Sequence, residues 1–331
     1  MSEFDLIKQH FTRATRHTNL SVGDDAALIA VSEGMELAIS ADMLVAGTHF
    51  FADTDPYQLG WKALAVNVSD MAAMGANPKW STLTIALPHN DTTWLTQFSN
   101  GFFACAEAFD IDLIGGDTTR TKHENGLTLS VQIMGEVPVG KAIRRSGAQA
   151  GDDIWVSGEL GKAAAALAHL LGSQNIPDTE LTDHLNALHM PQPRIALGLA
   201  LRDVATSCLD ISDGLLADLG HILKASKVGA DIQLQDILTS KFISSNLDKT
   251  EFRQYVLAGG DDYELCFTAS PNDEAYLHRL SKNLNLPLSK IGKITSSLGL
   301  NSLGLNSLGL NVFDTNNQII ELANTGYNHF N

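Results

Sequence analysis

Cysteine is scarce in this chain, and long apolar runs are missing. The three cysteines among its 331 residues, Cys105, Cys208 and Cys266, stand far apart. Without a Cys-x-x-Cys pair, neither a disulfide framework nor a zinc knuckle is supported, and buried, reduced thiols are the simpler interpretation. Met1–Ile7 lacks the apolar core of a signal peptide, and no segment has the roughly 18 apolar residues of a membrane span. We therefore predict a cytoplasmic protein without a membrane partner.

Basic residues are also few. Lysine and arginine number 22 against 38 aspartates and glutamates, which gives a formal net charge of −16. Nucleic acids and anionic membranes need clustered positive charge, so neither is an expected partner. Two interpretations of the acidity stay open: it keeps the protein soluble, or part of it awaits bound cations. For the total charge, solubility is the simpler of the two.

Several catalytic signatures are absent. No Gly-x-x-x-x-Gly-Lys-Ser/Thr segment occurs, so the chain is not a P-loop enzyme. The kinase catalytic loop and the Gly-x-Ser-x-Gly hydrolase signature are missing too. His49 and His123 do not have the spacing of a metal site, and a lone histidine is more often an ordinary surface or core residue.

Acidic motifs beside glycine or serine are what the sequence does contain. They are Gly23–Ala27, Asn67–Asp70, Gly115–Thr119, Asp210–Gly214 and Gly259–Glu264. Carboxylates that gather in a fold repel one another unless positive charge lies between them. Mg²⁺ is bound by carboxylate oxygens together with substrate phosphates. The motifs therefore indicate a metal and polyphosphate site built from distant parts of the chain, and scattered helix and turn caps are the alternative.

Length and the alternation of strand and helix signals indicate two α/β (α+β) domains, 1–140 and 141–331. In the first half we expect strands at 36–40, 80–87, 111–114 and 127–137 and helices at 55–74 and 91–109. In the second half we expect strands at 153–157, 207–209 and 263–268, helices at 193–203 and 213–226, an alanine-rich helix that ends near 171, and a polar surface segment over 173–189.

Asp70 carries the strongest single argument for a functional carboxylate. Its spacing to Ala63 and Asn67 puts it on a mostly apolar helix face, where an unpaired charge is costly. Asp42 is expected in the same half, just past the end of its strand.

The remaining acidic positions differ in strength. Asp25 follows a glycine in a turn and Asp213 stands at a helix start, so capping is the simpler interpretation of each alone. Asp117 is harder to explain as a cap, because Gly115 and Gly116 would let the backbone approach a ligand closely.

Residues 297–311 repeat Ser-Leu-Gly-Leu-Asn three times. A period of five residues fits neither a helix nor a strand, and three short copies do not make a solenoid. We interpret the repeat as a duplication inside a surface loop, where added length costs little free energy. Deletion of two copies should leave turnover intact.

In their order along the chain, the motifs resemble the thiamine-monophosphate kinase family of the aminoimidazole-ribonucleotide-synthetase-like superfamily. The similarity extends from Gly23 to Tyr327 and includes Val45–Phe50, Arg145–Ala148 and Gly326–Phe330. It implies ATP-dependent phosphorylation of thiamine monophosphate to thiamine diphosphate. It also implies a homodimer in which the N-terminal domains pair into a barrel-like sheet.

The resemblance implies roles for particular residues. Mg²⁺ ions, several per site, would be bound by Asp25, Ser40, Asp42, Asp70, Asp117, Asp210 and Asp213. ATP would be held by Gly116, Asp117, Arg145 and Ser212, and thiamine monophosphate by His49, Asp261 and Tyr327. The attacking phosphate oxygen is already anionic, so we expect direct in-line transfer without a general base.

Other functions stay open. Among related ATP-using enzymes, selenophosphate synthetase is disfavoured because no cysteine precedes Cys105, and aminoimidazole-ribonucleotide synthetase is disfavoured by Gly259–Glu264 and Gly326–Phe330. A two-metal phosphatase would use the same carboxylates to activate water and would consume no ATP. A non-enzymatic metal-binding protein would leave Arg145 and the glycine loops unexplained.

Overall fold

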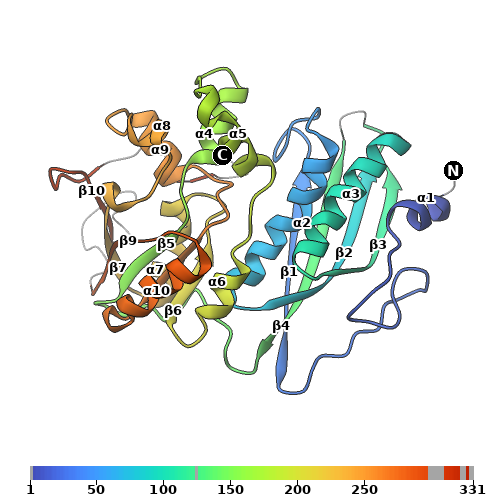
Figure 1. The fold of residues 1–331 in the computed structure, drawn as a ribbon, viewed down its shortest axis with the longest axis horizontal. Helices are drawn as coiled ribbons and strands as arrows, with labels where there is room; N and C mark the ends of the chain where they lie inside the picture. Colours follow the sequence, from blue (N-terminus) through green and yellow to red (C-terminus); the bar gives the residue numbers. More distant parts are fainter. Residues whose placement is uncertain (1–2, 124–125, 297–308, 321–325, 328–331) are drawn as a thin grey trace. The chain divides into compact units, whose positions relative to one another are not determined.

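The structure is a computed structural model that describes residues 3–123, 126–296, 309–320 and 326–327. The chain divides into two compact units, coloured blue to green and green to red in Figure 1. The first unit comprises residues 1–71 and 76–140, and the second comprises residues 72–75 and 141–331. In the described part of the chain, no helix is both long enough and apolar enough to cross a membrane.

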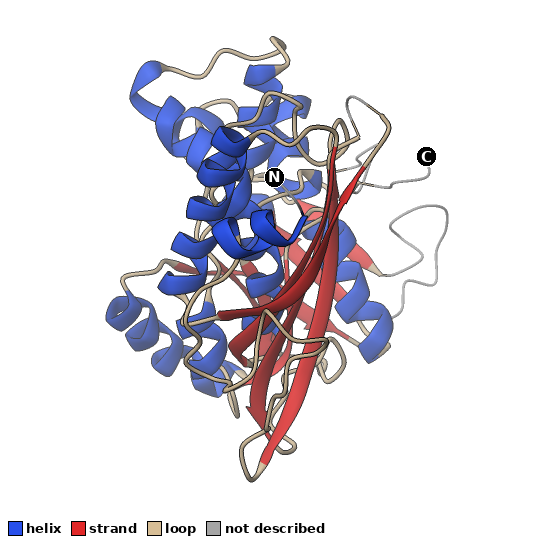
Figure 2. Cartoon of the chain, turned by 90° about the vertical axis from the view of Figure 1, so that its right-hand side faces the viewer, coloured by secondary structure: helices blue, strands red, loops and turns tan. Residues whose placement is uncertain are grey.

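A twisted four-stranded sheet with two long helices beside it forms the first unit (Figure 1 and Figure 2). Its helices are α1 (Glu3–His10), α2 (Pro56–Ala73) and α3 (Thr92–Ala108), and its strands are β1 (Met35–Val45), β2 (Asn77–Leu87), β3 (Asp112–Arg120) and β4 (Thr128–Pro138). The strand order is β1-β4-β2-β3, in which β4 runs antiparallel to both neighbours and β2 runs parallel to β3.

Local capping signals determine where the two long helices begin. The Asp55 carboxylate accepts a hydrogen bond from the amide of Gln58 at 3.0 Å, and Asp91 caps α3 in the same manner. The two helices pack closely, because a Cβ atom on Gly101 in α3 would overlap the carbonyl oxygen of Tyr57 in α2. Both helices begin within a residue or two of the predicted positions.

β1 is longer than the sequence predicts. We expected a strand that ends before Asp42, but every residue from Met35 to Val45 pairs with β4, so Asp42 lies inside the strand. Side chains alternate between the two faces of a strand. Ile39 and Met43 are 54% and 57% exposed, whereas Ser40 and Asp42 lie on the other, partly buried face.

A six-stranded sheet forms the centre of the second unit. Its strands are β5 (Asp153–Ser157), β6 (Ala205–Asp210), β7 (Gly229–Gln233), β8 (Leu265–Ala269), β9 (Leu288–Thr295) and β10 (Leu310–Phe313), in the order β10-β7-β9-β5-β8-β6. β10 runs parallel to β7, and the other neighbouring pairs in this order are antiparallel. The helices are α4 (Lys162–Leu170), α5 (Asp178–His189), α6 (Ile195–Ala200), α7 (Leu215–Ser226), α8 (Lys241–Ser244), α9 (Thr250–Ala258) and α10 (Glu274–Leu284).

The core of the second unit gathers around β5 and α7. β5 is buried over its whole length, and α7 places Leu215, Leu219 and Leu223 in the main apolar cluster. The predicted polar surface segment over 173–189 is mostly exposed or half-buried but contains a helix. From Asp178 onward it is α5, whose Leu188 packs against α4.

The end of the repeated segment also departs from the prediction. Residues 297–308 lie outside the described part of the chain. The last copy does not end in a loop, because Leu310, 2% exposed, begins β10 opposite Ala230 of β7. The Asn311 side-chain amide donates to Asp231 Oδ1 at 2.8 Å. The position beside β7 needs an apolar side chain, and a repeat leucine supplies it.

Candidate functional site

In the first unit, three of the predicted metal ligands lie together between β1 and α2. The Ser40 hydroxyl donates to Asp70 Oδ2 at 2.6 Å. Burial, followed by the charge of Asp70, raises the pKa of Asp42 to about 6. The pairing of β1 with β4 and the apolar face of α2 thus hold two carboxylates close enough to repel each other.

Asn67 fixes the position of this cluster, a role that the sequence did not single out. Its side-chain oxygen accepts from the backbone amide of Asp42 at 3.0 Å, and its side-chain nitrogen donates to the carbonyl of Ala63 at 3.1 Å. Asn67 is 1% exposed, so both hydrogen bonds are shielded from water. It stands one helical turn before Asp70, which was the available signal.

Asp25 and Asp117 lie on other parts of the first unit. Asp25 is exposed in a turn, where its backbone amide donates to Asp24 Oδ1 at 2.9 Å. Asp117 is exposed in β3, opposite Thr84 of β2. Across the residues that the structure describes, no three His, Cys, Asp or Glu side chains are grouped closely enough to hold a metal ion.

The two glycines before Asp117 lie inside β3, and close packing against β2 requires one of them. We expected a strand that stops at residue 114, but β3 continues through both glycines because β2 pairs with it. A Cβ atom on Gly116, where φ is +151°, would overlap the carbonyl oxygen of Leu83 in β2. At Gly115 the nearest atom, Thr82 Cγ2, would be 3.9 Å away. Packing against β2 therefore already explains one of the two glycines.

His49 shapes the turn after β1. Its Nδ1 accepts from the backbone amide of Val45 at 3.0 Å, and its own amide donates to the carbonyl of Val45 at 2.9 Å. The ring is partly buried. This turn follows the strand that carries Ser40 and Asp42.

In the second unit, predicted metal-binding and substrate-binding residues are joined through their backbones. Asp210 ends β6 and is 7% exposed. The carbonyl of Ser212 accepts from the amide of Asp261 at 2.9 Å, and the carbonyl of Asp213 accepts from the amide of Tyr327 at 3.0 Å. Three segments that are far apart in sequence therefore meet at the loop between β6 and α7.

The segment that carries Asp261 is held in an unusual conformation. Asp261 and Tyr263 have φ values of +66° and +50°, which side chains other than glycine rarely adopt. The Tyr263 hydroxyl donates to Asp261 Oδ1 at 3.1 Å, and the Tyr263 amide donates to the carbonyl of Ile211 at 2.8 Å. The strand predicted to start at residue 263 accordingly begins only at Leu265.

Two buried contacts anchor this segment, and the sequence did not predict either. Arg194 pairs with both carboxylate oxygens of Glu264, with 2.7 Å from Nε to Oε2. The Asp262 carboxylate accepts from the backbone amide of Gly161 at 3.0 Å. Burial and neighbouring carboxylates raise the pKa of Asp262 well above its usual range, although the amide opposes this.

Arg145 lies in an exposed loop beside α7. Ser226, the last residue of α7, accepts hydrogen bonds from the amides of Gly147 and Ala148 at 3.1 and 3.2 Å. His221, also on α7, has a pKa lowered by burial and then by the charge of Arg145. The loop is therefore tethered by its backbone, and its arginine side chain faces the surface.

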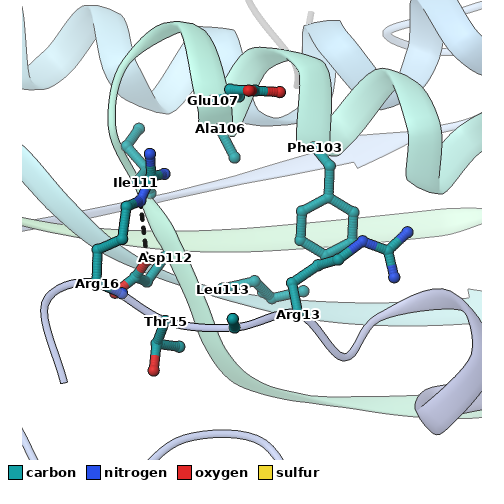
Figure 3. A pocket seen from close by; sticks show the side chains of 10 residues that line it. Arg13, Thr15, Arg16, Phe103, Ala106, Glu107, Ile111, Asp112 and Leu113 are labelled. Atoms are coloured by element: carbon teal, nitrogen blue, oxygen red, sulfur yellow. Dashed lines mark hydrogen bonds and ion pairs between the residues drawn. The ribbon is translucent and has the colours of Figure 1, made fainter. Parts of the chain in front are cut away.

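A cavity of about 190 Å³ lies in the first unit between α3 and the segment before β1 (Figure 3). The guanidinium of Arg13 lies 4.6 Å from the ring centre of Phe103, and Arg16 forms ion pairs with Asp110 and Asp112. None of the predicted site residues lines this cavity.

Known proteins match the chain along its length. Residues 23–137 match the family described as AIR synthase related protein, N-terminal domain, and residues 149–302 match AIR synthase related protein, C-terminal domain. A protein of Escherichia coli (strain K12) named thiamine-monophosphate kinase is 43% identical over 99% of this chain and 98% of its own length. The predicted two-domain α/β fold is thereby confirmed.

Solved structures agree with these matches. A crystal structure of thiamine-monophosphate kinase from Stenotrophomonas maltophilia K279a has a TM-score of 0.80 and 44% identity, and the match covers 89% of this chain and 93% of that one. A structure of AaThiL complexed with AMPPCP and TMP has a TM-score of 0.75 and 27% identity, over 99% of this chain and 96% of that one.

Proposed function

Because the chain belongs to the thiamine-monophosphate kinase family, we propose that it transfers a phosphoryl group from ATP to thiamine monophosphate. The products are thiamine diphosphate and ADP. The observation that carries the proposal is the joining of the Asp213, Asp261 and Tyr327 segments by backbone hydrogen bonds in the second unit. A metal-dependent kinase needs its phosphate-neutralising and substrate-contacting groups fixed relative to each other.

Mg²⁺ is proposed as the cofactor on the chemistry of the donor atoms, because no three His, Cys, Asp or Glu side chains in the described residues already form a metal site. The proposed ligands are Asp25, Ser40, Asp42, Asp70 and Asp117 in the first unit and Asp210 and Asp213 in the second. All of them offer oxygen atoms, which hard divalent ions prefer. The raised pKa of Asp42 supports the fit, since burial beside Asp70 disfavours its charge and a nearby cation would reverse that effect. When bound, Mg²⁺ neutralises phosphate charge and aligns donor with acceptor.

The substrates are assigned to two further groups of residues. We propose that ATP is held by Gly116, Asp117, Arg145 and Ser212, and thiamine monophosphate by His49, Asp261 and Tyr327. Two of these suit the cationic thiazolium ring of thiamine. Tyr327 is 50% exposed, so its ring is accessible for stacking on a cation. The partly buried Asp261 would offset the positive charge of that cation.

Transfer is proposed to be direct and in line, without a phosphoenzyme. The acceptor is a phosphate oxygen that is already anionic near neutral pH, so the protein has no proton to remove from it. The obstacle is repulsion between the two phosphates, ~4 kcal/mol for unit charges 4 Å apart at an effective dielectric of 20. The chain's own residues hold and orient the two substrates, and Arg145 adds fixed positive charge.

We also propose a homodimer in which the four-stranded sheets pair into a barrel-like sheet. β1 lies at the edge of its sheet and presents Ile39 and Met43, both more than half exposed. An exposed apolar face on an edge strand favours pairing with a second strand. A cytoplasmic location remains a prediction. The three buried, unpaired cysteines are compatible with it.

Product analysis tests the proposed reaction. Purified protein, Mg-ATP and thiamine monophosphate should yield thiamine diphosphate and ADP in equal amounts. Asp70→Asn and EDTA should abolish both products, whereas Asp248→Asn, at an exposed site on the second unit, should leave them unchanged. ATP binding without thiamine diphosphate would point to another activity of the superfamily. Release of phosphate from thiamine monophosphate without ATP would favour a phosphatase.

A further inference from the structure

The side chain of Asp218 is hydrogen-bonded to the loop between β6 and α7. It lies in the first turn of α7 and is 4% exposed. Its Oδ2 accepts hydrogen bonds from the backbone amides of Ser212, Asp213 and Gly214, at 3.0, 3.0 and 3.2 Å. One oxygen atom therefore fixes three consecutive peptide groups, an arrangement that a bound anion would otherwise fill.

The carbonyl side of the same loop makes different contacts. The carbonyl of Ser212 accepts from Asp261, and that of Asp213 accepts from Tyr327. At Gly214, where φ is +116°, a Cβ atom would lie 2.7 Å from the carbonyl carbon of Ala258. The loop is thus held by Asp218 on one side and carries the two substrate-contacting segments on the other.

We propose that Asp218 is a positioning residue for phosphoryl transfer. By holding the amides of the loop, it sets where the Asp213 carboxylate, Asp261 and Tyr327 lie relative to one another. The inference rests on the proposed function, because the substrate roles of Asp261 and Tyr327 belong to it. The side chain of Asp218 touches neither substrate in this account and acts through the backbone.

The alternative is that Asp218 only caps α7. A cap would stabilise the helix start and leave the carbonyl contacts in place. A positioning role requires more precise geometry than a cap, because small displacements of groups that orient substrates can lower the rate about 100-fold. The two roles therefore differ in what happens at Asp261 and Tyr327, and not in what happens to the stability of the protein.

Hydrogen exchange on the ligand-free full-length protein separates the two roles. Asp218→Asn keeps the volume and one acceptor oxygen but presents an amide donor or a weaker acceptor to the loop. We expect amide exchange at residues 261 and 327 to rise at least tenfold, together with that of the loop. Asp218→Ser, measured in the same way, replaces this variant if it does not fold.

Asp112→Asn is the matched control. Asp112 is 3% exposed, and its Oδ2 accepts from the amides of Arg16 and His17 at 2.7 and 2.6 Å, in the first unit. Asp218→Asn should raise the KM for thiamine monophosphate about tenfold, whereas the control should leave it within twofold after a similar loss of Tm.

An unchanged KM, with faster exchange confined to residues 212–214, would overturn the proposal in favour of a cap. The exchange experiment needs no substrate, so it remains interpretable if the wild-type protein makes no thiamine diphosphate. That last result would refute the proposed function, and the proposed role of Asp218 in phosphoryl transfer would be refuted with it.

Discussion

Replacing Arg194 with methionine should destabilise the second unit through a buried charge. Arg194 and Glu264 form a two-point ion pair, and their side chains are 27% and 6% exposed. Burial alone would lower the pKa of Arg194, but the hydrogen bond and charge of Glu264 outweigh it and raise the pKa overall. After the substitution, Glu264 would still accept the hydrogen bond from the Ser157 hydroxyl, which is 2.5 Å long in the wild type. It would lose its only described positive partner, the Arg194 guanidinium.

The size of the effect follows from burial. Removing one partner of a buried pair costs about 3–5 kcal/mol, and the partial exposure of Arg194 favours the lower end, about 3 kcal/mol. For a unit of this size, each kcal/mol lowers Tm by about 2–4 °C, so we expect a loss of about 6–12 °C. Urea unfolding followed by circular dichroism should give the same difference in the free energy of unfolding.

A double-mutant cycle isolates the pair from other effects of the substitution. Glu264→Gln removes the carboxylate charge, so the double variant no longer buries an unpaired charge. It should be clearly more stable than the sum of the two single losses predicts. A loss below about 1 kcal/mol for Arg194→Met, or additive single effects, would refute the argument, because the pair would then behave like an exposed one.

Three further predictions concern other parts of the molecule. In the folded state the pKa of Asp42 is raised from 3.8 to about 6. Between about pH 4 and 6, Asp42 therefore stays protonated in the folded state but loses its proton in the unfolded state. This group accordingly lowers the stability of the fold as the pH rises through that range. Asp42→Asn should therefore be more stable than the wild type at pH 8 without Mg²⁺, by up to about 3 kcal/mol, and the urea midpoints should converge near pH 4. Gly101→Ala should cost about 3 kcal/mol or more in urea unfolding, since its Cβ atom would overlap a backbone carbonyl of α2, whereas Gly115→Ala should cost less than half as much. Tyr327→Ala should weaken binding of thiamine monophosphate, measured by calorimetry, with little effect on ATP; unchanged affinity would remove the stacking role.

Structural features that depend on neighbouring residues, such as helix starts, were predicted well from the sequence. Asp55 and Asp91 cap helices that begin where the sequence indicates, because a capping side chain bonds to amides two or three residues away. Strand ends were predicted less well. β1 and β3 extend past their expected ends because β4 and β2 pair with the extra residues, and that pairing partner is not visible in the local sequence.

The anchoring contacts were beyond sequence reasoning for a similar reason. Arg194 and Glu264 are separated by 70 residues, and the sequence around each of them does not indicate which residue it will pair with. Asn67 and Asp218 did have a signal, since each lies within about a helical turn of a predicted ligand. The sequence argument assigned ligands by residue type and did not ask which side chains hold the backbone beneath them.

The two capping interpretations can now be weighed against the contacts. If Asp213 capped α7, its carboxylate would accept from amides at the helix start. The capping position of α7 is instead Gly214, which has no side chain, and the amides of Asp213 and Gly214 that bond to Asp218 come before the helix. In the first unit, the backbone amide of Asp25 donates to the carboxylate of Asp24. In both acidic motifs a neighbouring carboxylate, Asp218 or Asp24, accepts the hydrogen bonds of the local backbone amides. A carboxylate that does not bond to those amides can turn toward a cation, so these contacts are compatible with the proposed metal roles of Asp25 and Asp213.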